Sequence, residues 1–153
     1  MTPHPPRTFV LLLVEDDPGD AALAKCVLKD WRHPNVVHHV ADGLECLAFL
    51  RRQGEAYADA PRPDLILLDL NMPRLDGRDV LEALHADPGL ADIPVVVMTT
   101  SDAEADIARS YALGANSFIT KPVDFDRFQQ VMQAIEAYWC KTVTLPRTPD
   151  SAL

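Results

Sequence analysis

Short apolar runs of strand length alternate along this chain with segments in which apolar residues recur at helical spacing. The runs predict strands at residues 9–14, 36–40, 65–68, 93–98 and 117–120. Strands joined by helices in this way are parallel, because each crossover returns the chain to the same edge of the sheet. The pattern therefore predicts an α/β fold in three layers, with helices covering both faces of a parallel sheet.

Start and stop signals delimit the helices as clearly as the apolar spacing does. Helices are expected at 18–28, from 42–43 to near 53–54, from 76–77 to 87–89, at 101–114 and at 125–139. Ser101 and Glu104 form a capping box at the start of the fourth of these. Cys26 and Cys46 fall among helical apolar residues and are expected in the core as small hydrophobic side chains.

The composition favours a single acidic domain. The chain has 153 residues, of which 48% are hydrophobic, and its net charge of −9 argues against binding to nucleic acid or to an anionic membrane surface. No apolar run approaches the roughly 20 residues of a membrane span, and no signal peptide is recognisable, so a cytoplasmic protein is expected. We expect a domain at residues 8–140 between a disordered tail at 1–7 and an extension at 141–153.

Polar side chains stand where four of the expected strands end. Glu15 and Asp16 follow the first strand, Asp69 follows the third, Thr99 follows the fourth and Lys121 follows the fifth. The strand order cannot be derived from periodicity, but the common doubly wound order 2-1-3-4-5 would bring the first and third strands together. Three neighbouring carboxylates repel one another unless a cation lies between them, and oxygen ligands favour Mg²⁺ over zinc or copper.

Asp69 follows the most apolar strand and is the candidate nucleophile. Its carboxylate would attack a phosphorus atom to give an acyl phosphate, while the cation neutralises the phosphoryl oxygens. Lys121 would add a positive charge and Thr99 a hydrogen bond. Each of these residues alone is most simply an ordinary polar strand end in solvent. Their combination on four strand ends is what favours a phosphoryl site.

Together these motifs resemble the receiver domain of two-component response regulators. The resemblance covers about residues 8 to 140 and rests on Val14-Glu15-Asp16-Asp17, Asp69-Leu70-Asn71-Met72-Pro73, Asp76-Gly77, Met98-Thr99-Thr100 and Lys121-Pro122. It implies a flavodoxin-like (βα)5 fold and a phosphorylation-controlled switch, not an enzyme beyond its own phosphotransfer and dephosphorylation. Its phosphoryl donor would be a sensor histidine kinase.

The resemblance also implies a role for each matching residue. Asp69 corresponds to the phosphoacceptor, and Glu15 and Asp16 correspond to the acidic pair, with Asp16 the more direct ligand of Mg²⁺. Asn71 would give its backbone carbonyl to the same ion. Thr99 corresponds to the switch hydroxyl, and the lysine at position 121 to the essential lysine of the family.

Phe118 occupies the position of the switch aromatic, which is often tyrosine. Phenylalanine has no hydroxyl, so any hydrogen bond that tyrosine makes in the active state is lost. Rotation into a pocket does not need that hydroxyl, and a plain core aromatic is the alternative. Three segments look like the stand-alone regulators associated with bacterial phytochromes, namely residues 54–63, 98–101 and 138–146. Those regulators pair with light-regulated histidine kinases and tend to form homodimers through the fourth helix, fifth strand and fifth helix. The terminal aromatic residues would supply such a face or simply close the core.

Two other functions share parts of this pattern. A Mg²⁺ phosphatase of the aspartyl-phosphate type would use Asp69 and Lys121, but it usually has an acid two positions after the nucleophile. This chain has Asn71 there, which cannot transfer a proton, and it has no cap domain. A flavodoxin-like cofactor binder would need a phosphate loop after the first strand, where residues 15–20 are too acidic without a metal.

Overall fold

A computed structural model of the chain describes residues 8–70, 72, 74–99, 117–120 and 125–137. Its strands are β1 (Phe9–Val14), β2 (Asn35–Val40), β3 (Leu65–Asp69), β4 (Val95–Thr99) and β5 (Ser117–Thr120). Its helices are α1 (Pro18–Lys29), α2 (Gly43–Leu50), α3 (Gly77–Ala86) and α5 (Phe125–Glu136), with a 3-10 turn at Glu55–Tyr57. The helix predicted at 101–114 lies outside the described residues.

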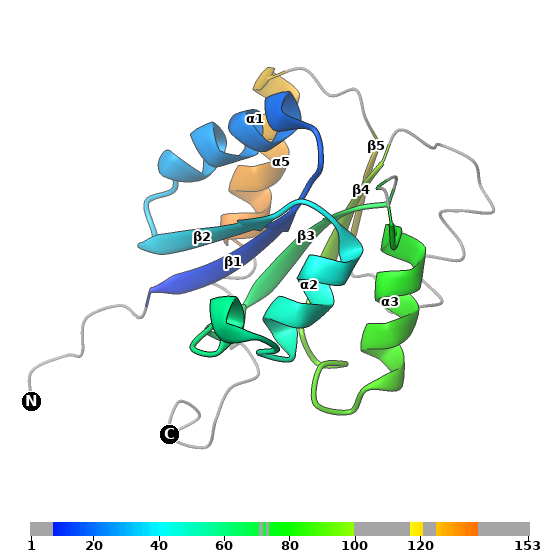
Figure 1. The fold of residues 1–153 in the computed structure, drawn as a ribbon. Coiled ribbons are helices and arrows are strands. Elements are labelled where there is room, and N and C mark those ends of the chain that lie inside the picture. The colour runs from blue at the N-terminus through cyan, green and yellow to red at the C-terminus, as the bar shows by residue number, and fades with distance from the viewer. Residues whose placement is uncertain (1–7, 71, 73, 100–116, 121–124, 138–153) are drawn as a thin grey trace, which may run out of the picture.

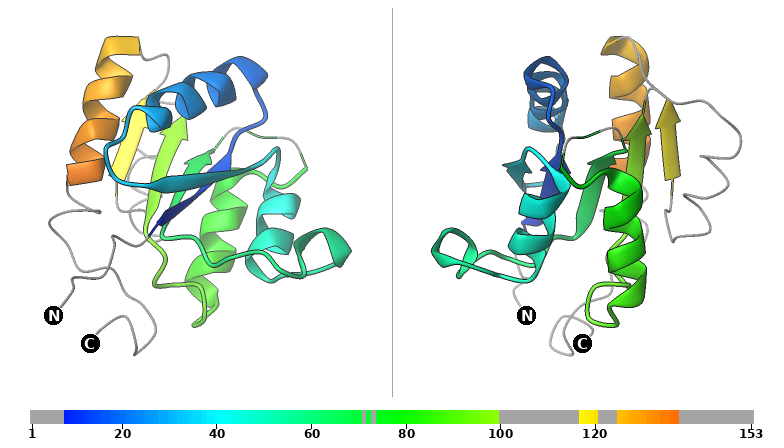
Figure 2. Two further views of the ribbon diagram at one scale, coloured as in Figure 1. Left: turned by 90° about the vertical axis from the view of Figure 1, so that its left-hand side faces the viewer. Right: turned by 45° about the vertical axis from the view of Figure 1, so that its right-hand side comes forward.

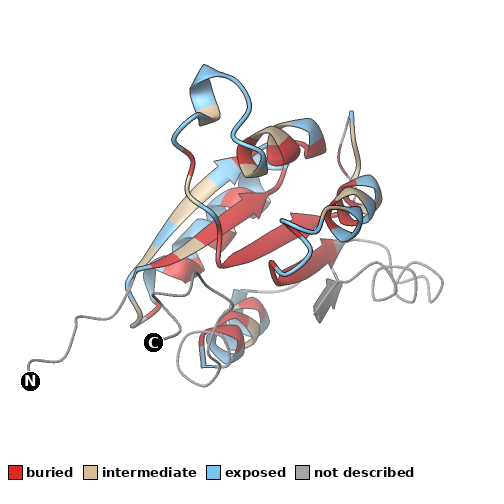
Figure 3. Cartoon of the chain, turned by 90° about the horizontal axis from the view of Figure 1, so that it is seen from below, coloured by how far each residue is buried: buried red, intermediate tan, exposed pale blue. Residues whose placement is uncertain are grey.

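The sheet is parallel and has the order β2-β1-β3-β4-β5, which confirms the doubly wound fold. Helices α1 and α5 cover one face, and α2 and α3 cover the other (Figures 1 and 2). Leu11 and Leu13 of β1 face the first pair of helices, and Leu12 and Val14 face the second. Because both faces are covered, β3 is buried along its whole length and β1 is buried except at Val10 (Figure 3), which explains their unbroken apolar runs.

Helix α1 buries a different face from the one predicted. Its apolar spacing predicts a buried face of Ala22, Leu23, Cys26 and Val27, whereas the buried residues are Ala21, Ala24, Val27 and Leu28. The prediction that Cys26 lies in the core is therefore wrong, since its side chain is exposed. This helix carries apolar residues almost all round, so periodicity alone defines its buried side weakly.

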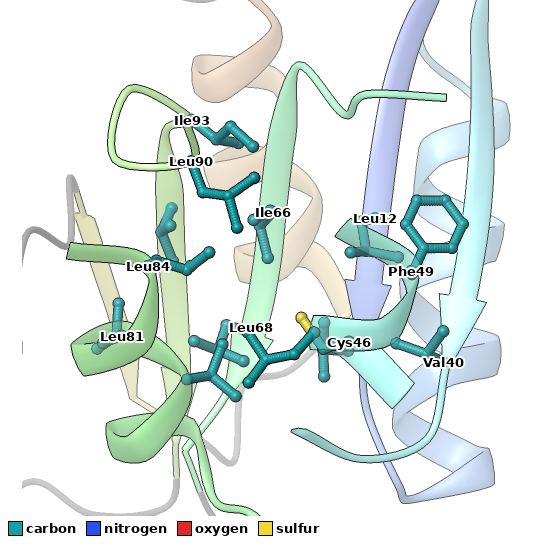
Figure 4. Close-up of a cluster of buried hydrophobic side chains, with 14 of the residues drawn as sticks. Leu12, Val40, Cys46, Phe49, Ile66, Leu68, Leu81, Leu84, Leu90 and Ile93 are labelled. Atoms are coloured by element: carbon teal, nitrogen blue, oxygen red, sulfur yellow. The ribbon is translucent and has the colours of Figure 1, made fainter. Parts of the chain in front are cut away.

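The prediction for Cys46 is confirmed, because its thiol is fully buried in the cluster under α2, beside Leu68 and Val40 (Figure 4). Burial raises the pKa of this thiol from 9.0 to about 12. That shift alone lowers the thiolate fraction about 1000-fold at neutral pH.

We therefore expect Cys26 of the native protein, which is exposed, to react with iodoacetamide faster than the buried Cys46 by roughly two orders of magnitude or more. Peptide mass mapping after timed alkylation would measure both rates in the same sample. Unfolding in urea should make the two rates similar. Comparable labelling in the native state would contradict the burial of Cys46.

Helix α2 ends at Leu50, earlier than the predicted limit near residues 53–54. The N–H of Arg52 donates to the carbonyl of Phe49 (3.2 Å), and that of Gln53 donates to Ala48 (2.9 Å). Arg52 has φ 53°, the left-handed conformation that terminates helices and that glycine usually supplies. The sequence has arginine there, so the stop signal was not recognisable.

Two further elements differ in detail from the prediction. Strand β4 begins at Val95 because the preceding Pro94 has no N–H for the ladder, although its carbonyl accepts from Ile66 (3.0 Å). In α5 the apolar residues repeat at steps of three and four, which predicts one buried stripe. Phe128, Met132 and Ile135 of this stripe are buried, whereas Phe125 is 42% exposed. Residues 138–153, including the predicted terminal aromatic face, lie outside the described residues, as does the tail at 1–7.

No helix in the described part of the chain is long and apolar enough to cross a membrane. The cytoplasmic location inferred from the sequence stays a prediction.

Candidate functional site

Three carboxylates meet at the carboxyl edge of the sheet. Glu15 and Asp16 follow β1, and Asp69 ends β3, the strand that lies beside β1. Oxygen atoms from all three side chains lie within 4.8 Å of one another. Glu15 is 1% exposed and Asp69 is 5% exposed, whereas Asp16 is exposed. The cluster therefore has two buried carboxylates and one that faces solvent, where a ligand can enter.

Backbone groups hold Glu15 in place. Its N–H donates to the carbonyl of Val40 at the end of β2 (3.1 Å), and its Oε1 accepts from the N–H of Asp17 (3.1 Å). Nε2 of His39 lies 2.8 Å from the Glu15 carbonyl oxygen. The end of β2 thus fixes the first acidic residue, a contact that the sequence pattern did not predict.

Asp17, the third acid of the motif after β1, serves the helix instead of the cluster. Its Oδ1 accepts from the N–H groups of Gly19 (2.8 Å) and Asp20 (3.3 Å), so it is the N-cap of α1. A carboxylate at this position also interacts favourably with the helix dipole. Among the consecutive acids, only Glu15 and Asp16 belong to the cluster with Asp69.

The chain returns tightly against Asp69 at the start of α3. The N–H of Gly77 donates to the carbonyl of Leu70 (3.0 Å), and the N–H of Leu70 donates to Met98 of β4 (3.1 Å). A Cβ atom on Gly77 would lie 2.6 Å from the Asp69 carbonyl oxygen. Only glycine allows this approach, so the backbone of Asp69 is confined between β4 and α3.

Asp42 links the start of α2 to the loop that follows Asp69. Its Oδ1 accepts from the N–H of Glu45 (2.9 Å), which caps the helix. Its Oδ2 accepts from Nε of Arg74 (2.9 Å) and also from Nη2 of the same guanidinium. The sequence marked Asp42 as a helix start, but nothing in it signalled an ion pair with a residue 32 positions away.

This contact gives the stability a pH dependence. Burial raises the pKa of Asp42, but hydrogen bonds from Glu45 and Arg74 and the charge of Arg74 outweigh it, so the pKa lies below its ordinary 3.8. Because the folded pKa is the lower one, this stabilisation is complete above the unfolded pKa and is lost as the pH falls through the folded pKa.

We expect Asp42→Asn, which keeps an oxygen for the cap, to lower the free energy of unfolding at neutral pH. The difference from the wild type should begin to shrink as the pH falls below about 4 and should vanish below the lowered pKa of the folded state, where the wild-type carboxylate is also neutralised. Urea titrations across this range would measure it. A difference that stays constant with pH would contradict a contribution from the ionised form.

The other predicted site residues are only partly described. Thr99 ends β4 opposite Thr120 of β5, so the fourth and fifth strand ends are neighbours, and Phe118 lies opposite Val97. The structure describes the backbone of these β5 residues and of Thr99. Asn71 and Lys121 lie outside the described residues, so their roles stay predictions.

The acidic cluster fits a hard divalent cation. Its donor atoms are all carboxylate oxygens, two of the groups are buried, and their mutual repulsion is relieved when a cation neutralises them. Such a donor set suits Mg²⁺ or Mn²⁺ better than zinc or copper.

The comparisons agree with this geometry. Residues 11–133 match the response regulator receiver domain family. The chain is 46% identical over 143 residues to response regulator Rcp1 from Synechocystis sp., covering 94% of this chain and 95% of that protein. The crystal structure of the phosphorylated cyanobacterial phytochrome response regulator RcpA superposes with a TM-score of 0.86 at 46% identity, covering 92% of this chain and 100% of that one. The Mn²⁺-bound form of Rcp1 gives a TM-score of 0.84 at the same identity, covering 91% and 99%.

The chain therefore belongs to the receiver domain family of two-component response regulators. Within that family it is homologous to the phytochrome response regulators Rcp1 and RcpA. It is a phosphoacceptor signalling protein and not an enzyme in the ordinary sense, which decides against the phosphatase and cofactor-binding alternatives.

Proposed function

We propose that Asp69 accepts a phosphoryl group from the phosphohistidine of a sensor histidine kinase. The observation that carries this proposal is the position of its carboxylate, at the end of a buried strand and within 4.8 Å of two further carboxylates. Mg²⁺ would be held by Glu15, Asp16 and Asp69, with the backbone carbonyl of Asn71 as a further ligand. The Mn²⁺-bound structure of Rcp1 supports a divalent ion at such a site.

The transfer makes one bond and breaks one. A carboxylate oxygen of Asp69 attacks the phosphorus, the O–P bond forms, and the N–P bond to the kinase imidazole breaks. The imidazole nitrogen keeps the electron pair, and the acyl phosphate remains on the aspartate. The metal ion, when bound, offsets the charge of the phosphoryl oxygens. Thr99 and Lys121 would contact the same oxygens through a hydroxyl and an ammonium group.

The phosphoryl group would then change which partner the protein binds. Contacts to Thr99 would draw in the segment that follows β4, and the aromatic side chain of Phe118 would rotate in response. We infer a phytochrome-type histidine kinase as the donor, since the relatives at 46% identity include a phytochrome response regulator. We also propose a homodimer formed through the fourth helix, β5 and α5, where the exposed Phe125 is an available apolar contact.

The experiment that tests the proposal is intact mass spectrometry after incubation with acetyl phosphate. We expect a gain of one phosphoryl group with Mg²⁺ and none when a chelator replaces the metal. Beryllofluoride, a phosphoryl analogue, covers the case in which the acyl phosphate hydrolyses too fast to detect. If neither a mass gain nor binding of beryllofluoride with Mg²⁺ were observed, the phosphoacceptor assignment would be wrong.

A further inference from the structure

Two arginines of the described chain adopt the left-handed backbone conformation that usually requires glycine. They are Arg52, with φ 53°, and Arg74, with φ 67°. This conformation strains any residue that has a Cβ atom, and in both arginines it is accompanied by a side-chain contact. Nε of Arg52 donates to the carbonyl of Ala60 (2.7 Å), and Arg74 donates to the Asp42 carboxylate through two nitrogens. Only Arg74 lies in the loop that follows Asp69.

The residues that follow Arg74 and Asp42 in the sequence, Leu75 and Gly43, make a second contact beside the first. The N–H of Gly43 donates to the carbonyl of Leu75 (3.1 Å). A Cβ atom on Gly43 would lie 2.1 Å from that oxygen, so the two backbones touch. Neighbouring residues of the two turns therefore form one side-chain contact and one backbone contact, which fasten the loop to the start of α2.

The segment from the end of β2 to the start of α2, which contains Asp42, is also hydrogen-bonded to Glu15 of the acidic cluster. The carbonyl of Val40, two residues before Asp42, accepts from the N–H of Glu15 (3.1 Å). The turn from β2 to α2 thus bridges the backbone that carries Glu15 and the loop that follows Asp69. Figure 1 shows this turn leading into α2 on the sheet face that α3 also covers.

We propose that Arg74 is a positioning residue of the cation and phosphoryl site. By binding Asp42, it fixes the loop after Asp69 relative to the segment that carries Glu15, so that the carboxylates are held ready for the cation. This inference rests on the proposed function, because it concerns the affinity of the same site. Arg74 touches neither the cation nor the phosphoryl group and acts through the loop.

The sign of the effect separates positioning from simple electrostatics. Removing a positive charge near an anionic site strengthens the binding of a divalent cation if charge alone matters. Losing a group that orients metal ligands weakens it, typically by 10- to 100-fold. A weaker affinity after removal of Arg74 therefore cannot arise from the charge change.

The test compares Arg74→Gly with Arg52→Gly. Both substitutions remove one guanidinium from a left-handed residue, and glycine adopts that conformation without strain. Isothermal titration calorimetry with Mn²⁺, and separately with Mg²⁺ and beryllofluoride, gives the affinities. Urea unfolding in chelator gives the stability of the metal-free fold. Asp42→Asn tests the partner, and the double variant shows whether the two residues act as one unit.

We expect Arg74→Gly to weaken Mn²⁺ binding about 10-fold, with Arg52→Gly within about 2-fold of the wild type. Asp42→Asn should weaken binding similarly, and the double variant should be no worse than either single one. Unchanged or tighter binding in Arg74→Gly, or an equal loss in Arg52→Gly, would overturn the inference. A wild-type protein that binds no divalent ion would instead overturn the proposed function, so the two failures are distinguishable.

Discussion

Asp69→Asn is expected to abolish the gain of a phosphoryl group completely and, at the same time, to stabilise the metal-free fold. The amide is not a nucleophile toward phosphorus, so no acyl phosphate can form at this position. Asp69 is 5% exposed and its oxygens lie within 4.8 Å of those of Glu15 and Asp16. Removing its charge relieves the repulsion among the three carboxylates, so we expect the variant to be more stable than the wild type in chelator.

Two comparisons make this expectation specific. Asp16→Asn should also stabilise the metal-free fold but leave the nucleophile intact, so that phosphorylation slows without disappearing. Asp59→Asn removes the same charge from an exposed loop outside the cluster and should change neither property. Intact mass spectrometry and urea unfolding would measure both quantities. Phosphorylation of Asp69→Asn at the wild-type level would place the acceptor elsewhere.

The prediction that the polar residues after β1 and β3 lie close together depends on features that are local in the sequence. Apolar runs locate β1 and β3, and the residues just beyond a buried strand lie at its carboxyl edge. Proximity of Glu15, Asp16 and Asp69 then needs only the common strand order, which the structure has. Burial on both faces makes this pattern strong, since a central strand tolerates few polar residues.

What the sequence did not predict depends on contacts between distant segments or on weak periodicity. The pairing of Arg74 with Asp42 joins two loops, and neither residue has a local pattern that indicates the other. The buried face of α1 was misplaced because apolar residues surround that helix, which left Cys26 on the wrong side. Asp17 stands in the acidic run but caps a helix, as its hydrogen bonds to Gly19 and Asp20 show.

Gly77→Ala is expected to destabilise the protein by roughly 2–3 kcal/mol, although alanine is the better helix former by about 1 kcal/mol. The added methyl group would lie 2.6 Å from both the Asp69 carbonyl oxygen and the Leu70 Cα atom. These are backbone atoms of a strand end packed between β1 and β4, so they cannot move away as a flexible side chain would. Relief of the clash must displace either α3 or Asp69 itself.

Gly19→Ala is the matched control, because it also adds a methyl group in the first turn of a helix. Its Cβ would meet only the Asp17 carboxylate, at 3.2 Å, and that side chain can shift, so we expect a change within about 0.5 kcal/mol. Urea unfolding with and without Mg²⁺ measures both variants. If the clash moves Asp69, the stabilisation that Mg²⁺ gives should also fall in Gly77→Ala, since a displaced carboxylate binds the cation less well. Equal stabilities of Gly77→Ala and the wild type would show that α3 can withdraw without disturbing the end of β3.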